Sequence, residues 1–220
     1  MRVWHYPKSS VSPLCVVPQL APSQGGFVRI SKGFAEHERE RIATLYWEAF
    51  GAKLGRTLGP REKALTYIRR VLSKDHAICA HDSRGQLLGV AGFKTAQGAL
   101  VDGSIRDMAS VYGWIGALVR VGILAFLERD VENVRFLMDG IFVDPAARGA
   151  GVGSHLLEAI VAEAASRGYG EVRLDVIDSN ERARALYERR GFEAVSTQST
   201  GFARYIFGFR SATTMVRRIA

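Results

Sequence analysis

The sequence predicts a mixed α/β domain of the α+β kind, in which helices flank a central sheet. Three observations support this fold class. Strand-like runs alternate with helix-like runs from Phe27 to the end of the chain. A length of 220 residues suits one domain with a sizeable core. Finally, one strand-like run passes through a glycine-rich turn directly into an amphipathic helix pattern.

The expected elements follow from apolar spacing and from the positions of glycine and proline. Ile42, Leu45 and Phe50 share one helix face, and glycines at 51, 55 and 59 interrupt that helix before Pro60 begins the next. In chain order we expect strand 27–30, helices 35–50 and 61–72, strands 76–82 and 86–93, a helix in 110–127, strand 134–143, helix 153–167, strand 171–177, helix 180–190, and strands 192–197 and 213–219.

The first 26 residues differ from the rest of the chain. They contain four prolines and no continuous apolar run, so we expect an irregular arm at 1–26 without a secretory signal. Residues 27–220 then form a single domain.

Composition limits the classes of partner. Hydrophobic and charged contents of 47% and 24% are ordinary for a soluble globular protein. The net charge of +8 favours a polyanionic partner, either nucleic acid, anionic lipid or a phosphorylated cofactor. Because the basic residues are scattered, we expect no nucleic acid partner. Cys15 and Cys79 are far apart and no histidine has metal-ligand spacing, which favours a reduced, cytoplasmic protein without a metal.

An apolar stretch at 110–127 requires a membrane test. It is barely long enough to span a bilayer, and Arg120 near its middle would be costly in lipid. A single crossing would also separate strands that we expect in one sheet. We therefore expect no membrane span, and a buried or cleft-covering helix instead.

The segment 144–154 carries the clearest chemical signal. Its glycines let the backbone approach a ligand closely, and the free N–H groups of a helix start bind anions such as a diphosphate. A dinucleotide GxGxxG pattern started at Gly149 fits poorly because Ser154 takes its last position. A GxxxxGK[ST] phosphate loop lacks its lysine. A tight turn without a ligand is the remaining alternative.

Two linked motifs resemble a known family. Arg148-x-x-Gly151-x-Gly153, after a strand that ends in Asp144-Pro145, resembles the acetyl-CoA pyrophosphate motif of the GNAT superfamily of N-acetyltransferases. The segment 180–192, with Asn180, Leu186-Tyr187 and Gly191-Phe192, resembles the next motif of that family. The resemblance covers about 138–195. It implies a mixed, mostly antiparallel sheet flanked by helices, with an apolar helical insertion at about 99–131 between the third and fourth strands.

The resemblance implies acetyl-CoA as co-substrate, and it implies the residues that bind it. The loop backbone would hold the pyrophosphate, the end of the preceding strand would pair with the pantetheine arm, and the Val143 N–H could polarise the thioester carbonyl. Asn180 would bind near the reactive end, or serve as a helix N-cap, or both. The cofactor-binding residues implied in this way are Ile141, Phe142, Val143, Arg148, Gly149, Ala150, Gly151, Val152, Gly153, Ser154 and Asn180.

Three residues are candidates for proton transfer. Tyr187 matches the general acid that protonates the leaving thiolate, although its spacing also suits an aromatic core residue. Asp175 and Asp139 are alternative general bases, and either could instead be an exposed or ion-paired carboxylate. Some family members use no dedicated base, because direct transfer mainly requires positioning.

The sequence therefore predicts an N-acetyltransferase that moves an acetyl group from acetyl-CoA to a primary amine on a small molecule or peptide. A non-catalytic acyl-CoA-binding regulatory module is the alternative. The apolar insertion has two open roles. It could roof the acceptor cleft, which would favour an apolar or aromatic amine, or it could form a homodimer interface.

Overall fold

The structure is a computed structural model that describes residues 27–125, 135–199, 201 and 208–219. The predicted arm at 1–26 and part of the insertion lie outside these residues. The described helices are α1 (Arg39–Leu58), α2 (Arg61–Val71), α3 (Ile105–Ala125), α4 (Val152–Ser166) and α5 (Glu181–Arg189), with 3-10 turns η1 (Glu36–Glu38), η2 (Lys74–His76) and η3 (Pro145–Ala147). The described strands are β1 (Arg29–Lys32), β2 (Ala77–His81), β3 (Leu87–Lys94), β4 (Phe136–Val143), β5 (Glu171–Ile177), β6 (Glu193–Ser199) and β7 (Ser211–Arg218).

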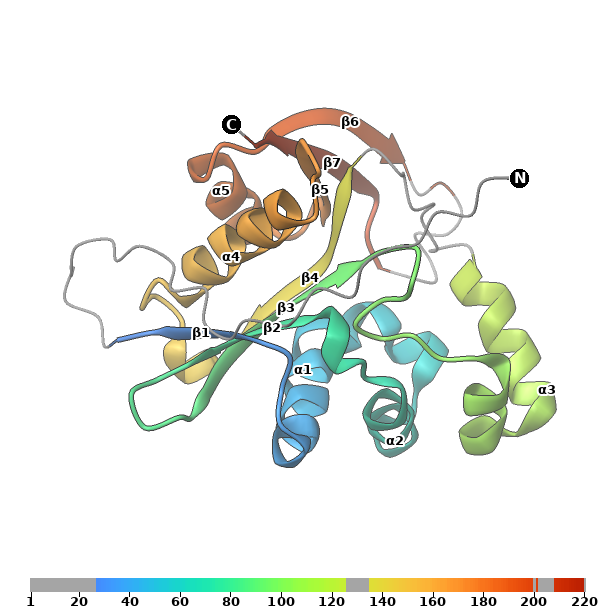
Figure 1. Ribbon diagram of the computed structural model, residues 1–220. Coiled ribbons are helices and arrows are strands. Elements are labelled where there is room, and N and C mark those ends of the chain that lie inside the picture. The colour runs from blue at the N-terminus through green and yellow to red at the C-terminus, as the bar shows by residue number, and fades with distance from the viewer. Residues whose placement is uncertain (1–26, 126–134, 200, 202–207, 220) are drawn as a thin grey trace, which may run out of the picture.

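One sheet organises the described residues, with strand order β1-β2-β3-β4-β5-β7-β6. Neighbouring strands are antiparallel except for β4 and β5, which are parallel. Helices α4 and α5 cover one face, and α1 and α2 cover the other (Figure 1). The helix α3 lies between the third and fourth strands in the chain. These features confirm the predicted fold class, including the position of the helical insertion.

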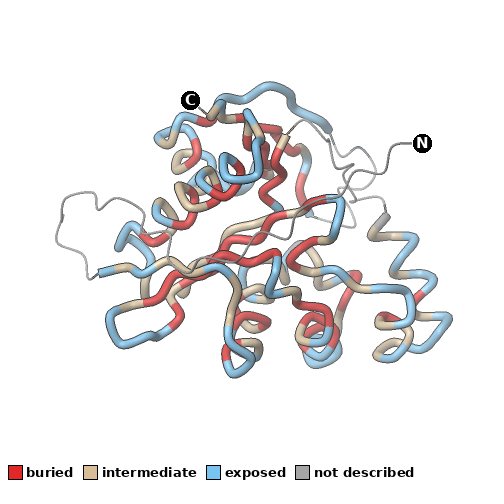
Figure 2. Tube along the Cα trace, viewed as in Figure 1, coloured by how far each residue is buried: buried red, intermediate tan, exposed pale blue. Residues whose placement is uncertain are grey.

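Alternation along the strands builds a core on each face of the sheet. Leu174 and Val176 of β5 pack with Leu156 and Leu157 of α4, whereas Cys79 and Val90 pack under α1 and α2 on the other face. Figure 2 shows the buried residues concentrated along the sheet and on the helix surfaces that face it. The two cores fix α1 and α4 on opposite faces of the sheet.

The first helix differs from its predicted end. Gly51 and Gly55 do not interrupt α1, which continues to Leu58. The Trp47 ring packs against Gly51, and a Cβ added at Gly51 would lie only 3.0 Å from that ring. Packing of this ring along the helix, together with burial of Leu58, outweighs the cost of about 1 kcal/mol that each glycine imposes.

The apolar insertion forms α3, which begins at Ile105 rather than near Ser110 because Ser104 and Asp107 make a capping box. The Asp107 N–H donates to Ser104 Oγ at 3.3 Å, and the Ser104 N–H donates to Asp107 Oδ2 at 3.0 Å. Helix geometry breaks at Gly113, where φ is 74°. By length and composition Ile105–Leu124 could cross a membrane, and only 11% of its most apolar window is buried within the protein. The buried alternative is therefore wrong for this helix, whereas a cleft-covering role and the absence of a span stay predictions. Among the described elements, α3 packs mainly on α1 and α2 (Figure 1).

Two leucines test this division into core and surface. Leu157 of α4 is fully buried, whereas Leu118 of α3 is 60% exposed. We expect Leu157→Ala to lower the free energy of unfolding by about 2–5 kcal/mol, because it leaves a cavity in a packed core. The matched Leu118→Ala should change it by less than about 0.5 kcal/mol. Urea denaturation of both variants measures the difference, and equal losses would contradict the described position of α3.

Candidate active site

The sheet opens in its middle, between β4 and β5. These two strands pair only where Phe136 meets Val172 and Leu137 meets Arg173. On their outer sides both strands stay paired, β4 with β3 as far as Val143 and β5 with β7 as far as Ile177. Figure 1 shows β4 close to β5 at one end and leading away from it toward the start of α4. The result is a gap between two rigid strands, bordered by backbone that lacks a sheet partner on that side.

Backbone N–H groups of β4 point into this gap. The Asp144 N–H donates to the Leu88 carbonyl of β3 at 2.8 Å. Because N–H groups alternate in direction along an antiparallel strand, the N–H groups of Val143 and Ile141 point the opposite way. The structure thus leaves two donors directed toward the opening, as an added strand or an extended ligand would require.

The loop after β4 ends in a cluster of unpaired amides. Gly149 and Gly151 adopt φ of 87° and 79°, a left-handed conformation that turns the chain into α4. Among the described residues, the N–H groups of Gly149, Gly151, Val152 and Gly153 have no backbone partner. Donors at a helix N-terminus, with the positive end of its dipole, bind anions.

Close packing places this amide cluster beside the gap. A Cβ on Gly153 would lie 3.2 Å from Leu186 of α5 and 4.0 Å from Val143 of β4. The start of α4 therefore lies against the end of β4 and against α5. Arg148, the expected charged partner of a pyrophosphate, is exposed next to the cluster.

Asp144 anchors the loop at its other end. Its Oδ1 accepts the Ala146 N–H at 2.9 Å, and its Oδ2 pairs with Arg41 of α1. These two interactions, the amide hydrogen bond first, hold the pKa of the Asp144 carboxyl below its usual value. The contact of Arg41 with this loop was not predicted, because no local pattern in the sequence indicates a contact between residues so far apart in the chain.

The motif on α5 places Tyr187 and Asn180 on the same side of the sheet as α4. Tyr187 is 5% exposed and packs in the core with Val152 and Val176. Burial raises its pKa above the usual value for a tyrosine. Asn180 is the N-cap of α5, where its Oδ1 accepts the Ala183 N–H at 3.3 Å. The predicted capping role is therefore present.

Asp175 lies on the opposite face of β5 from the core residues Leu174 and Val176. Its Oδ1 accepts a hydrogen bond from the Thr214 hydroxyl at 2.5 Å, and its Oδ2 lies 3.6 Å from an Arg173 nitrogen. Thr214 was another residue that sequence analysis missed, since β7 gives no local sign of pairing with this carboxylate.

Asp139 also lies on the face away from α4. A bulge interrupts the β3–β4 pairing, with Gly92 opposite Gly140 and Phe93 opposite Met138, so that Asp139 is the extra residue. Asp139 is exposed, and its charge contributes, after burial, to the raised pKa of Tyr46 on α1. The structure therefore places Tyr187 and the two carboxylates on opposite faces of the sheet, near the strand edges that stay unpaired between β4 and β5.

Comparison with known proteins identifies this arrangement. The pattern of the Acetyltransferase (GNAT) family matches residues 39–192, which include the gap, the amide cluster and α5. The chain belongs to the GNAT acetyltransferase family.

Relatives agree with this membership. The chain is 29% identical over 85 residues to thialysine N-epsilon-acetyltransferase of Bos taurus, covering 39% of this chain and 49% of that protein. It is 36% identical over 70 residues to the Bacillus subtilis N-acetyltransferase YhfO, covering 32% and 44%. The chain thus spans about half the length of these curated relatives. An N-acetyltransferase structure from Staphylococcus aureus Mu50 superposes with a TM-score of 0.60 at 15% identity, covering 86% and 99%, and shows the same fold.

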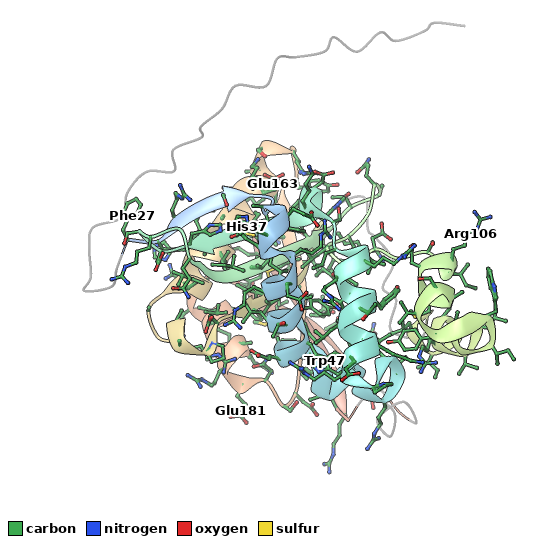
Figure 3. The ribbon with its side chains drawn as sticks, turned by 90° about the horizontal axis from the view of Figure 1, so that it is seen from below. Phe27, His37, Trp47, Arg106, Glu163 and Glu181 are labelled. Atoms are coloured by element: carbon green, nitrogen blue, oxygen red, sulfur yellow. The ribbon has the colours of Figure 1, made fainter. Side chains whose placement is uncertain are left out.

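A separate hollow lies at the β1 edge of this GNAT sheet. A cavity of about 660 Å³ is lined by residues that include His37, Glu38, His81 and Glu163, and none of the predicted site residues lines it. Figure 3 shows His37 and Glu163 near this edge. We place the site at the β4–β5 gap, where the motif residues and unpaired donors converge. Among the described residues no group of three or more histidine, cysteine or acidic side chains could hold a metal ion.

The anchor at Asp144 yields a pH-dependent prediction. Because its folded pKa lies below the usual 3.8, its stabilisation is present above that pH and is lost as the pH falls through the folded pKa. We expect Asp144→Ala to cost about 1 kcal/mol at pH 7, and the difference from the unaltered chain to shrink below pH 3.8.

Asp144→Asn is the control, since it keeps an acceptor for Ala146 but removes the charge. Urea denaturation between pH 3 and 7 measures all three proteins. A difference between Asp144→Ala and the unaltered chain that stays constant down to pH 3 would rule out the ionised carboxylate as the anchor.

Proposed function

We propose that this GNAT-family protein is an N-acetyltransferase that moves an acetyl group from acetyl-CoA to a primary amine by direct transfer. The observation that carries the proposal is the gap between β4 and β5, with four unpaired amides at its mouth. An extended thioester with a diphosphate at one end matches both parts of this arrangement. The acceptor would be a small molecule or peptide.

The residues present fit acetyl-CoA, which would supply the acetyl group as an activated thioester. The amides of Gly149, Gly151, Val152 and Gly153 would bind the diphosphate, and Arg148 would add positive charge. The inward N–H groups of Ile141 and Val143 would hydrogen-bond the extended arm. Val143, at the end of β4, would stabilise negative charge that develops on a carbonyl oxygen.

Tyr187 would hold the proton that the leaving group needs. Burial raises its pKa, so the phenol stays protonated at neutral pH and can donate a hydrogen bond to the leaving thiolate. Its ring packs in the core under α4.

The acceptor would approach from the opposite face, where Asp139 and Asp175 lie. Asp175 accepts a hydrogen bond from Thr214 and lies beside Arg173, and Asp139 is exposed at a bulge beside the gap. Either carboxylate would accept a proton from the amine, directly or through water.

A charge substitution tests the amide cluster without disturbing the fold. Ala150 is exposed in the loop, and Ala165 is exposed in the last turn of α4. We expect Ala150→Glu to weaken acetyl-CoA binding by about tenfold or more, because it adds a negative charge beside the diphosphate site. Ala165→Glu makes the same change far from the cluster and should bind normally.

Thermal melts with acetyl-CoA, and with NAD as a control nucleotide, give the readout. At about 100 times its dissociation constant acetyl-CoA should stabilise the unaltered chain by about 2.7 kcal/mol. If acetyl-CoA leaves the melting midpoint unchanged, the proposed co-substrate is wrong.

A hydroxyl deletion separates an enzyme from a non-catalytic acyl-CoA-binding module. We expect Tyr187→Phe to lower kcat by about 10²–10⁴-fold while the acetyl-CoA shift is retained. Tyr169→Phe is the matched control, since Tyr169 packs on Phe136 and lies outside the site motifs. Thiol release with a panel of amines measures turnover. Binding without turnover for any amine would favour the regulatory module, and Asp139→Asn and Asp175→Asn in the same assay show which carboxylate matters.

A further inference from the structure

The second half of α3 exposes a stripe of large apolar side chains. Trp114, Ile115, Leu118 and Val119 are 63%, 83%, 60% and 57% exposed. Their spacing places them along one helix face, and we call these four residues the α3 ridge. Figure 2 shows α3 at the edge of the molecule with its outer side exposed. A contiguous apolar stripe of this kind marks an interaction surface.

The ridge cannot turn inward, because the opposite side of α3 is fixed to the domain. Ala117 is buried against the α1–α2 side, and the Tyr112 hydroxyl donates to the Leu58 carbonyl. The Arg120 guanidinium donates to the Gly59 carbonyl at 3.4 Å and lies 4.0 Å from the centre of the Tyr112 ring. The Arg120 guanidinium, which would be costly in lipid, is thus directed toward protein and away from the ridge.

Charge indicates what covers the ridge. The helices α2 and α3 together carry six basic and two acidic side chains. Three of the six basic groups are engaged within the protein: Arg69 with Glu40, Arg70 with Asp107 at 2.9 Å, and Arg120 with the Gly59 carbonyl. The other three outnumber the remaining acid, Glu62. Arg61 and Lys63 are exposed at the start of α2, just after Gly59, and Arg106 points outward from the start of α3 (Figure 3). An apolar ridge on a chain with this excess of positive charge, +8 overall, matches the surface of an anionic bilayer, where apolar side chains enter the acyl boundary and cations contact phosphates.

Helix geometry favours the bilayer surface over a span. Gly113 breaks the helix, so no straight helix runs through Ile105–Leu124, whose 20 residues would otherwise reach the thickness of a hydrocarbon core, about 30 Å. The strands β3 and β4 on either side of α3 also pair in one sheet, which a single crossing would not allow. Trp114 lies at the start of this segment, and tryptophan prefers the membrane–water interface.

We propose that the α3 ridge binds the protein peripherally to anionic lipid bilayers, with α3 lying in the plane of the interface. The lipid is recognised by its anionic headgroup and acyl boundary. This property is separate from acetyl transfer and requires no acyl-CoA.

Vesicle co-sedimentation of the full chain tests the proposal. The protein should sediment with phosphatidylcholine vesicles that contain phosphatidylglycerol, bind at least tenfold less to phosphatidylcholine alone, and dissociate as salt rises. The Ile115→Ser/Leu118→Ser variant should bind anionic vesicles at least tenfold more weakly. Val195→Ser is the control, since Val195 is an apolar residue of β6 with 54% exposure away from the ridge.

Two further measurements complete the test. The tryptophan fluorescence should shift to the blue with anionic vesicles, and Trp114→Phe should lose that shift although Trp4 and Trp47 remain. Unchanged melting midpoints show that the variants are folded. The proposal is overturned if the unaltered chain ignores anionic vesicles or if the double variant binds them normally. It is also overturned if sedimentation equilibrium shows a dimer that the double variant abolishes without any vesicle binding, since a second copy then covers the ridge.

Discussion

The structure depends on one backbone constraint, the end of the β4–β5 pairing after two residue positions. Buried backbone N–H and C=O groups must find partners, so a sheet that opens in its middle needs something to fill the opening. The outer pairings of β4 with β3 and β5 with β7 hold the two sides apart. A ligand with a peptide-like arm could then take the place that an additional strand would occupy and make the same kind of hydrogen bonds to the backbone.

Two faces of the sheet divide the proposed chemistry. The face under α4 and α5 contributes the amide cluster and Tyr187, and the other face contributes Asp139 and Asp175. In direct transfer the amine attacks the thioester while both substrates are bound. In the proposed mechanism, acetyl-CoA would be bound by the amides at the start of α4 and the amine would approach from the other face. Exposure of Asp139 would let an acceptor reach it, and Tyr187, protonated at neutral pH, could donate a hydrogen bond to the leaving group.

Local chemistry explains which features could be predicted from the sequence. The glycine loop and the cap at Asn180 could be predicted because left-handed turns and helix caps require particular residues at particular positions. The contact of Arg41 with Asp144, and that of Thr214 with Asp175, join segments far apart in the chain, and no local pattern encodes them. The extension of α1 through Gly51 has a different origin, since the contact of Trp47 with Gly51 lies within one helix and its packing outweighs the low helix propensity of glycine. The roles proposed for Tyr187, Asp139 and Asp175 stay predictions.

The break at Gly113 has a consequence for how this protein could change. Its φ of 74° is one that residues with a side chain adopt at a cost of about 1–2 kcal/mol, so most replacements would favour a straight helix. A straight helix over the 20 residues Ile105–Leu124 would be about 30 Å long, which equals the thickness of a hydrocarbon core. Such a rod could not cross a bilayer, because β3 and β4 on either side of α3 pair in one sheet and must stay on the same side. The single glycine instead lets Tyr112 and Arg120, on either side of the break, both reach the connection between α1 and α2, so that the insertion folds along the domain rather than projecting from it.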